Sequence, residues 1–387
     1  MDSREWEYSR VYAQIDLEAI RANLEQIGRQ TKQTKVLAVV KCDGYGHGSA
    51  PIARAIEDMD IVGGYATATA EEALELRGAG IGKPILILGY TFPYAYEELI
   101  RRDVRMTVFR EDTLGILETA AQRVGKKAFL HVKVDTGMGR IGIRPSEESL
   151  AFLRRIDGSG HLELEGIFTH FAKADERDMR YTLEQTERFM WFVEMAETDL
   201  GRRIPCRHAS NSAGIVRLPQ AHLDMVRAGI ILYGLCPSED MAGEAKWLRP
   251  ALSLHSHLVY VKEVAPGQSI SYGGTFTATR TMRVGTVPVG YGDGYPRSLS
   301  QKGSVLIRGR RAAILGRVCM DQFMVDITDL PQVKEGEPVV LLGRDGQEEI
   351  TAQELGDLSG RFNYELVCDL SPRVPRVYLR DGRLISV

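Results

Sequence analysis

Short apolar runs alternate with amphipathic segments along the first 245 residues. Residues 35–41, KVLAVVK, form a continuous β-branched run, which is typical of a strand buried on both faces. Further runs of this kind lie near residues 61–66, 84–89, 105–109, 128–134, 162–170, 204–208 and 223–232. Periodic apolar positions predict helices between most of them, over residues 49–58, 70–79, 112–124, 146–156 and 180–199. The pattern is therefore a repeated strand-then-helix order.

One more helix is predicted before the first of these strands. Asp16 suits its N-cap, apolar residues follow at helical spacing, and Gly28 suits the position after its last turn. Eight strands in a β-then-α order over about 230 residues predict a parallel (β/α)8 TIM barrel. A doubly wound open sheet is the alternative, because it is built from the same units.

The pattern changes after about residue 245. Segments such as SLHSHLVYVKEV, GSVLIRG and FMVDITDL alternate apolar and polar residues over short lengths, with Gly and Pro between them. This texture predicts a separate, mostly antiparallel β domain. We expect a barrel over residues 1–245 and a C-terminal β domain over residues 246–387, with the first ten or so residues as a potential addition to the second domain.

Composition excludes several classes of protein. Lys plus Arg number 49 and Asp plus Glu number 52, for a net charge of −3, so no basic nucleic-acid surface is expected. No apolar stretch approaches the length of a membrane span, and the charged start, MDSREWEYSR, is unlike a signal peptide. We expect a cytoplasmic protein with neither membrane nor nucleic-acid partners.

The cysteines and the paired histidines give little sign of a metal site. The five cysteines are far apart and include no C-x-x-C pair, which indicates reduced thiols rather than disulfides or a zinc site. His255 and His257 would share one face of a strand. A metal site there is the less favoured interpretation, and no metal is expected.

Polar residues end five of the predicted strands. Lys41 ends the first, Lys133 and Asp135 end the fifth, and His170 ends the sixth. His208, Asn211 and Ser212 follow the seventh strand, and Arg227 lies in the eighth. Chemistry in a barrel lies at the carboxyl ends of its strands, so these residues predict one site.

Each of these residues also has an ordinary structural explanation. Lys41 could be a solvated strand end, Lys133 could pair with Asp135, and Arg227 could pair with Asp224. His170 could be a hydrogen-bonded core histidine. Because the positions coincide on one predicted rim, a functional site is the better interpretation.

The chemistry of this rim indicates a phosphorylated aldehyde cofactor. A strand-end lysine can form a Schiff base with an aldehyde when its amine is desolvated. Phosphate sites in barrels favour the loops after the last two strands, where the chain reads HASNSAG and RAGI. Hydroxyl groups and glycine N–H groups there suit a phosphate. Together these features favour pyridoxal 5′-phosphate.

Motifs from about residue 10 to residue 380 resemble those of the alanine racemase family. They include VVKCDGYGHG, VDTGMGRIG, THFAKADE, HASNSAG, MVRAGIILYGL, ISYGGTF, VGYGDGYPR and GRVCMDQFMVDIT, in the family's order. The racemase domains of vancomycin-resistance serine/alanine racemases share them. The resemblance implies a barrel that carries pyridoxal phosphate, a C-terminal β domain and a homodimer with shared active sites.

The resemblance also implies roles for individual residues. Lys41 would hold the cofactor, Arg227 would meet its pyridine nitrogen, and His208 would support Arg227. The remaining cofactor-binding residues would be Tyr45, His170, Asn211, Ser212, Gly229, Ile230 and Tyr364. Arg140, together with Met320 and Asp321 of the second subunit, would bind the substrate. Lys133 matches a lysine that is carbamylated in many family members.

The implied reaction interconverts L-alanine and D-alanine, which supplies D-alanine for peptidoglycan. Lys41 would exchange a proton with the D-enantiomer and Tyr272 of the second subunit with the L-enantiomer. An isolated phenol is protonated at neutral pH, so this role requires positive charge near Tyr272. Cys42, Asp43 and Gly44 depart from the Ala, Asn and Ala that are common in the family's lysine motif.

Three alternatives differ in what they require of the sequence. A barrel decarboxylase of basic amino acids would lack the SYGG and CMDQ stretches in these contexts, and a single-domain pyridoxal-phosphate carrier would lack the β domain. A serine/alanine or broad-specificity racemase stays open, because an apolar pocket rejects an added hydroxyl poorly. Tyr364 favours alanine, since some serine-racemising relatives have a smaller polar residue there.

Overall fold

The computed structural model describes residues 9–385. The described chain forms two compact units, one of residues 20–44 and 48–249, the other of residues 9–19, 45–47 and 250–385. We call them the barrel unit and the β unit. The boundary between residues 245 and 246 that the sequence favours stays a prediction.

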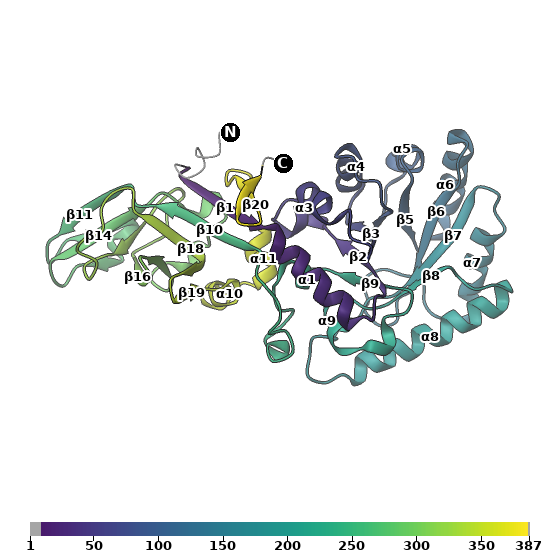
Figure 1. The fold of residues 1–387 in the computed structure, drawn as a ribbon. Coiled ribbons are helices and arrows are strands. Elements are labelled where there is room, and N and C mark those ends of the chain that lie inside the picture. Colours follow the sequence, from purple (N-terminus) through teal and green to yellow (C-terminus); the bar gives the residue numbers. More distant parts are fainter. Residues whose placement is uncertain (1–8, 386–387) are drawn as a thin grey trace. The chain divides into compact units, whose positions relative to one another are not determined.

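The barrel unit contains a single parallel sheet of eight strands (Figure 1). Their order is β8-β7-β6-β5-β4-β3-β2-β9. Backbone hydrogen bonds from Asp224 N to Arg207 O (3.1 Å) and from Arg227 N to Ser210 O (3.0 Å) join the segments around β8 and β9. The strands are β2 (Lys35–Val39), β3 (Val62–Thr67), β4 (Ile85–Ile87), β5 (Val104–Val108), β6 (Ala128–Lys133), β7 (Leu162–Phe168), β8 (Cys206–His208) and β9 (Met225–Ala228). The predicted barrel is confirmed, and the open-sheet alternative is wrong.

Helices follow most of these strands and lie outside them (Figure 1). They are α3 (Ser49–Ile56), α4 (Ala70–Gly78), α5 (Tyr96–Arg101), α6 (Glu111–Val124), α7 (Leu150–Asp157), α8 (Arg180–Leu200) and α9 (Ser212–Arg217). Sequence patterns did not predict α5 and α9, since six residues are too few to show a helical period.

The first helix, α1 (Leu17–Gln30), begins where the sequence predicts. Asp16 Oδ1 accepts hydrogen bonds from Glu18 N (2.9 Å) and Ala19 N (3.1 Å), which confirms the N-cap. The predicted end is wrong, because Gly28 lies inside the helix. A Cβ added at Gly28 would make only an ordinary contact with the Ile61 side chain, at 3.4 Å, so the helix passes through this position without requiring a glycine.

The β unit is mostly antiparallel, as predicted. Its large sheet has the order β11-β14-β17-β16-β15-β18-β10-β1-β20-β21, and β19 pairs with β18. The strands are β1 (Val11–Asp16), β10 (Leu252–His257), β11 (Tyr260–Val264), β14 (Met282–Val287), β15 (Ser304–Ile307), β16 (Arg310–Leu315), β17 (Phe323–Asp326), β18 (Pro338–Asp345), β19 (Glu348–Ile350), β20 (Arg376–Arg380) and β21 (Arg383–Ile385). β12 (Ser269–Ile270) and β13 (Phe276–Thr277) form a separate pair, and α10 (Ala352–Ser359) and α11 (Asn363–Cys368) complete the unit.

The sequence did not predict β1, which is an internal strand of this sheet. It pairs antiparallel with β10 and parallel with β20. Both partners come from the last 140 or so residues, so a local pattern could not show this pairing. In the described part of the chain, no helix is both long and apolar enough to cross a membrane.

Candidate active site

Lys41 follows the first barrel strand and begins a left-handed turn. β2 ends at Val39, so Lys41 lies two residues beyond the strand that it was expected to end. The next four residues, Cys42 to Tyr45, have φ values of +53°, +48°, +61° and +52°. Four consecutive left-handed residues are unusual for L-amino acids and mark strained backbone of the kind found at functional sites.

Asp43 and Gly44 suit this turn for identifiable reasons. Asp43 Oδ1 accepts a hydrogen bond from Ser49 N (2.8 Å) at the start of α3, and its backbone oxygen accepts one from Gly48 N (2.8 Å). A Cβ added at Gly44 would lie only 3.2 Å from Ser49 N, and glycine adopts positive φ without steric cost. Nothing in the structure explains Cys42.

Arg227 is buried in the barrel without a carboxylate partner among the described residues. Its Nη1 donates to His208 Nδ1 (3.0 Å), and its Nη2 donates to the backbone oxygens of Thr169 and Ala209, both at 2.8 Å. Its side chain is 2% exposed. These bonds fix the guanidinium plane.

The expected alternative partner of Arg227 binds elsewhere. Asp224 pairs with Arg207 (2.9 Å) and with Arg203. The ordinary explanation of Arg227 as the partner of Asp224 is therefore wrong.

Four basic side chains lie near His170. Burial lowers the pKa of His170 well below its usual value, and the charges of Arg227, Lys133, Arg140 and Lys41 lower it further. Arg227 Nη2 lies 3.4 Å from His170 Nδ1. The structure thus brings together the residues that follow four of the strands predicted to form the site.

Lys133 is buried next to Arg227 rather than paired with Asp135. Its Nζ donates to Val134 O (3.1 Å) and lies 5.2 Å from the centroid of the Phe168 ring. Asp135 Oδ1 instead accepts from Gly137 N (3.0 Å) and Gly139 N (3.1 Å). Burial, and then the charge of Arg227, lower the pKa of the Lys133 amine to about 7, so a large share of it is neutral at physiological pH.

The loops after β8 and β9 meet through one hydroxyl group. Ser212 Oγ accepts a hydrogen bond from Gly229 N (3.0 Å). Asn211 caps α9, because its Oδ1 accepts from Gly214 N (3.0 Å). Ile230 begins a 3₁₀ turn, η5 (Ile230–Tyr233), and is buried. The structure therefore brings Ser212, Gly229 and Ile230 together.

Two further predicted site residues meet in the β unit. The rings of Tyr45 and Tyr364 lie with their centroids 6.1 Å apart at an interplanar angle of 66°. The Tyr364 ring also stacks on Phe362, with centroids 4.3 Å apart. Tyr45 of the lysine motif and Tyr364 of α11 are thus neighbours.

The remaining predicted site residues lie on exposed loops of the β unit. Tyr272 is 71% exposed and Met320 is 53% exposed. The two loops adjoin, because Ser271 Oγ donates to Arg317 O (2.8 Å) and lies 3.6 Å from Cys319 Sγ. Asp321 pairs with Arg373 (2.7 Å).

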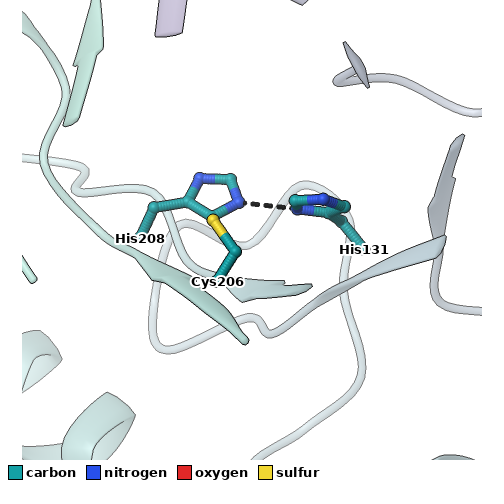
Figure 2. A group of neighbouring side chains, drawn as sticks. All are labelled: His131, Cys206 and His208. Carbon is teal, nitrogen blue, oxygen red and sulfur yellow. Dashed lines mark hydrogen bonds between the residues drawn. The ribbon is translucent and has the colours of Figure 1, made fainter. Parts of the chain in front are cut away.

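His131, which the sequence analysis missed, contacts His208 inside the barrel (Figure 2). His131 Nδ1 lies 2.9 Å from His208 Nε2, and Cys206 Sγ joins them in a group whose ligand atoms lie within 4.8 Å of one another. His131 stands two residues before Lys133 on one strand, so the two share a face. That spacing was the signal in the sequence.

We predict that Gly166→Ala destabilises the barrel unit. An added Cβ would lie 2.3 Å from His131 Nδ1 and 2.9 Å from Cys206 O, so the imidazole or the strand must move. Overpacking of this kind costs about 1–3 kcal/mol, which a lower urea midpoint would show. Gly160→Ala is the control, because nothing lies within 4 Å of its added Cβ. Equal midpoints for the two variants would contradict the prediction.

Comparison with known proteins places this site in a family. Residues 15–237 match the alanine racemase N-terminal domain and residues 251–378 match the alanine racemase C-terminal domain. An alanine racemase of Halothermothrix orenii is 44% identical over 368 residues, which cover 95% of this chain and 96% of that protein. One of Desulfovibrio desulfuricans is 45% identical over 371 residues, with 95% and 98% covered.

Solved structures agree. An alanine racemase of Clostridium difficile 630 superposes with a TM-score of 0.93 at 40% identity and covers 98% of each chain. The Bacillus anthracis alanine racemase with bound L-Ala-P superposes with a TM-score of 0.89 at 37% identity, covering 98% of this chain and 97% of that one. This chain therefore belongs to the alanine racemase family, whose members are pyridoxal-phosphate-dependent isomerases.

Proposed function

We propose that this protein interconverts L-alanine and D-alanine with pyridoxal 5′-phosphate as its cofactor. The observation that carries the proposal is the group of basic side chains near His170, which consists of Lys41, Lys133, Arg140 and Arg227. Arg227 and Lys133 are buried, Lys41 is partly buried and Arg140 is exposed, and a buried positive charge is costly unless an anion accompanies it. A cofactor with a phosphate group and an acidic substrate group satisfies that requirement, so the residues present fit it.

Several residues are proposed to hold the cofactor. Lys41 would bind it covalently through its amine. Arg227 would donate to the pyridine nitrogen, since a guanidinium stays protonated and can only donate. The phosphate would be bound by Tyr45, Ser212, Gly229, Ile230 and Tyr364. His170 and Asn211 would also contact the cofactor, and His208 would support Arg227. When bound, the cofactor withdraws electron density from the amino acid and makes its α-proton acidic.

Racemisation requires a proton donor or acceptor on each side of the α-carbon. Lys41 would exchange a proton with the D-enantiomer and Tyr272 with the L-enantiomer. Tyr272 is largely exposed within its own chain, which supports a role in the site of a second copy. We propose a homodimer in which Tyr272, Met320 and Asp321 complete the partner's active site.

Arg140 is proposed to bind the carboxylate of the substrate. Lys133 would support it as a carbamate, in which the neutral amine forms an N–C bond to carbon dioxide and releases one proton. The lowered pKa of Lys133, about 7, supports this modification because only the neutral amine is a nucleophile. A carbamate would also place a negative charge beside Arg140 and Arg227.

The test is to measure kcat/KM for L-alanine and L-serine with the purified, cofactor-loaded protein. We expect L-alanine to be preferred and the product to be D-alanine. Comparable values for both substrates would establish the alternative, a serine/alanine or broad-specificity racemase. Failure to racemise either amino acid would contradict the proposal. In the cell we place the enzyme in the cytoplasm, where it would supply D-alanine for peptidoglycan.

A further inference from the structure

A continuous row of hydrogen bonds links one side chain from each of five adjacent barrel strands. Arg227 of β9 bonds to His208 of β8 (3.0 Å), and His208 bonds to His131 of β6 (2.9 Å). His131 Nε2 lies 3.1 Å from Glu165 Oε2 of β7, and Arg105 of β5 donates to both Glu165 oxygens at 3.1–3.3 Å. We call these five residues the barrel relay.

The barrel relay has only one consistent direction. A guanidinium can only donate, so His208 Nδ1 must accept from Arg227 and the His208 proton must be on Nε2. That proton is donated to His131 Nδ1, which places the His131 proton on Nε2. Glu165 then accepts it, because an ionised carboxylate can only accept. Both imidazoles are therefore neutral Nε2–H tautomers.

The end of the barrel relay is held as an anion. Burial disfavours ionisation of Glu165, but hydrogen bonds from His131 and Arg105 outweigh it and lower its pKa to about 2. Burial, and then the charge of Arg227, lower the pKa of His208 well below its usual value. The carboxylate thus supplies the one acceptor that the two neutral imidazoles need.

A β-bulge is associated with the position of Glu165. Leu130 of β6 pairs with Leu164, and His131 pairs with Gly166, so Glu165 is the extra residue on β7. Bulges re-aim side chains and are uncommon between parallel strands. Gly166 leaves the space in which the His131 ring lies. Both irregularities of β7 thus serve the contact between His131 and Glu165.

His208 is also fixed by packing. Its ring stacks on Phe168 with centroids 4.7 Å apart and an interplanar angle of 5°, and it is fully buried. The ring cannot change its hydrogen bonds by turning outward. Whether Nδ1 can accept a hydrogen bond from Arg227 therefore depends only on which of the two ring nitrogens carries the proton.

We propose that Glu165 and His131 are positioning residues for the reaction, which fix the tautomer of His208 and through it the orientation of Arg227. The effect on catalysis rests on the proposed function, in which Arg227 meets the pyridine nitrogen. With the opposite tautomer, His208 Nδ1–H would face an Arg227 N–H across 3.0 Å. Donor would then oppose donor, and the guanidinium would have to move.

The barrel relay also argues against a metal at His131, Cys206 and His208. His208 Nδ1 accepts from Arg227, and its Nε2 carries a proton, so it has no lone pair to give. Burial raises the pKa of the Cys206 thiol to about 12, with a further contribution from Asp224. A metal would have to displace two protons next to Arg227 and Lys133.

The test uses Glu165→Gln in protein labelled with ¹⁵N-histidine, with His208 signals assigned by loss in His208→Asn. In the wild type we expect a protonated Nε2 and an unprotonated Nδ1 at His208. The glutamine amide can donate to His131 Nε2, which reverses the barrel relay, so the protonated signal should move to Nδ1 in part or wholly. We expect kcat to fall while KM changes little.

Two variants keep this test decisive. Glu163 lies on the same strand and pairs with Lys127 (2.8 Å). Glu163→Gln should therefore leave both the His208 tautomer and kcat as in the wild type. Glu165→Asp retains the carboxylate and should retain the His208 tautomer, including where Glu165→Gln folds poorly. An unchanged tautomer and kcat in Glu165→Gln, or the same reversal in Glu165→Asp, would overturn the proposal.

Two other outcomes would lead to different conclusions. Binding of one Co²⁺ per chain that depends on His131, seen in the visible spectrum of the cofactor-free protein, would overturn the proposal in favour of a metal site. A reversed tautomer in Glu165→Gln of a protein that neither binds pyridoxal phosphate nor racemises alanine would refute the proposed function. It would leave the tautomer control by Glu165 standing.

Discussion

Replacing Lys41 by alanine is expected to abolish racemisation and the covalent attachment of pyridoxal phosphate. The side chain would lose both of its proposed tasks, since it would hold the cofactor and move one proton. Loss of a covalent and acid–base group of this kind lowers kcat by about 10³-fold or more. The purified wild type should be yellow, and borohydride should fix the cofactor to the peptide that contains Lys41.

Two controls separate these tasks from charge. Lys41→Arg keeps the positive charge but has no amine that can form the link, so it should be as inactive as alanine. Lys35→Ala changes an exposed lysine at the start of the preceding strand, β2, whose amine donates to Asp60 O (2.5 Å), and should retain colour and activity. A yellow, borohydride-reactive Lys41→Ala would contradict the assignment.

Tyr272→Phe is expected to stop racemisation and leave cofactor binding intact. The ring remains and only the hydroxyl is lost, so kcat should fall about 10²–10⁴-fold. In deuterium oxide, Lys41 should still exchange the α-proton of D-alanine, whereas exchange from L-alanine should disappear. This asymmetry is the measurement, and mass spectrometry of the recovered enantiomers provides it.

The control for that variant is Tyr260→Phe, another exposed tyrosine of the β unit, on β11. It should exchange both enantiomers as the wild type does. Co-expression of Tyr272→Phe with Lys41→Ala should restore part of the activity, because a mixed dimer would contain one complete site. Equal loss of exchange from both enantiomers would refute the assignment, and the absence of restored activity would refute the shared site.

The barrel could be predicted because each of its strands carries its own signal. β2 and β6 are continuous apolar runs, and their order alternates with helices. β1 could not be predicted in the same way, since its partners β10 and β20 come from the other end of the chain. The end of α1 was misplaced because the helix continues through Gly28 to Gln30, and a glycine inside a helical pattern does not by itself end a helix.

The rule that barrel chemistry lies at strand ends located Lys133 and Arg227, but it did not decide their partners. Asp135 and Asp224 stand close to them in sequence, and only the structure shows that both carboxylates bind elsewhere. Glu165 gave no signal, because its contact with His131 depends on a bulge. Alternation of apolar and polar residues assumes a regular strand and cannot show a bulge.

The lysine motif shows how far sequence and structure complement each other. The sequence identified Asp43 and Gly44 only as departures from the family pattern. The left-handed turn explains both, since Asp43 binds the start of α3 and Gly44 avoids Ser49. These two substitutions are therefore compatible with an intact turn after Lys41, which could not be judged from the sequence alone.

The position of β1 between β10 and β20 has a consequence for synthesis on the ribosome. β1 is synthesised well before its partners, which begin only at Leu252 and Arg376. At 5–20 residues per second, about 20–70 s pass before β20 can join it. Until β10 is made, both edges of this strand lack their native neighbours, and the edge that β20 covers lacks its neighbour for the whole interval. Unpaired strand edges are prone to aggregation. The β unit thus cannot be completed until segments far apart in the sequence have been made, and we expect its yield to depend on chaperones.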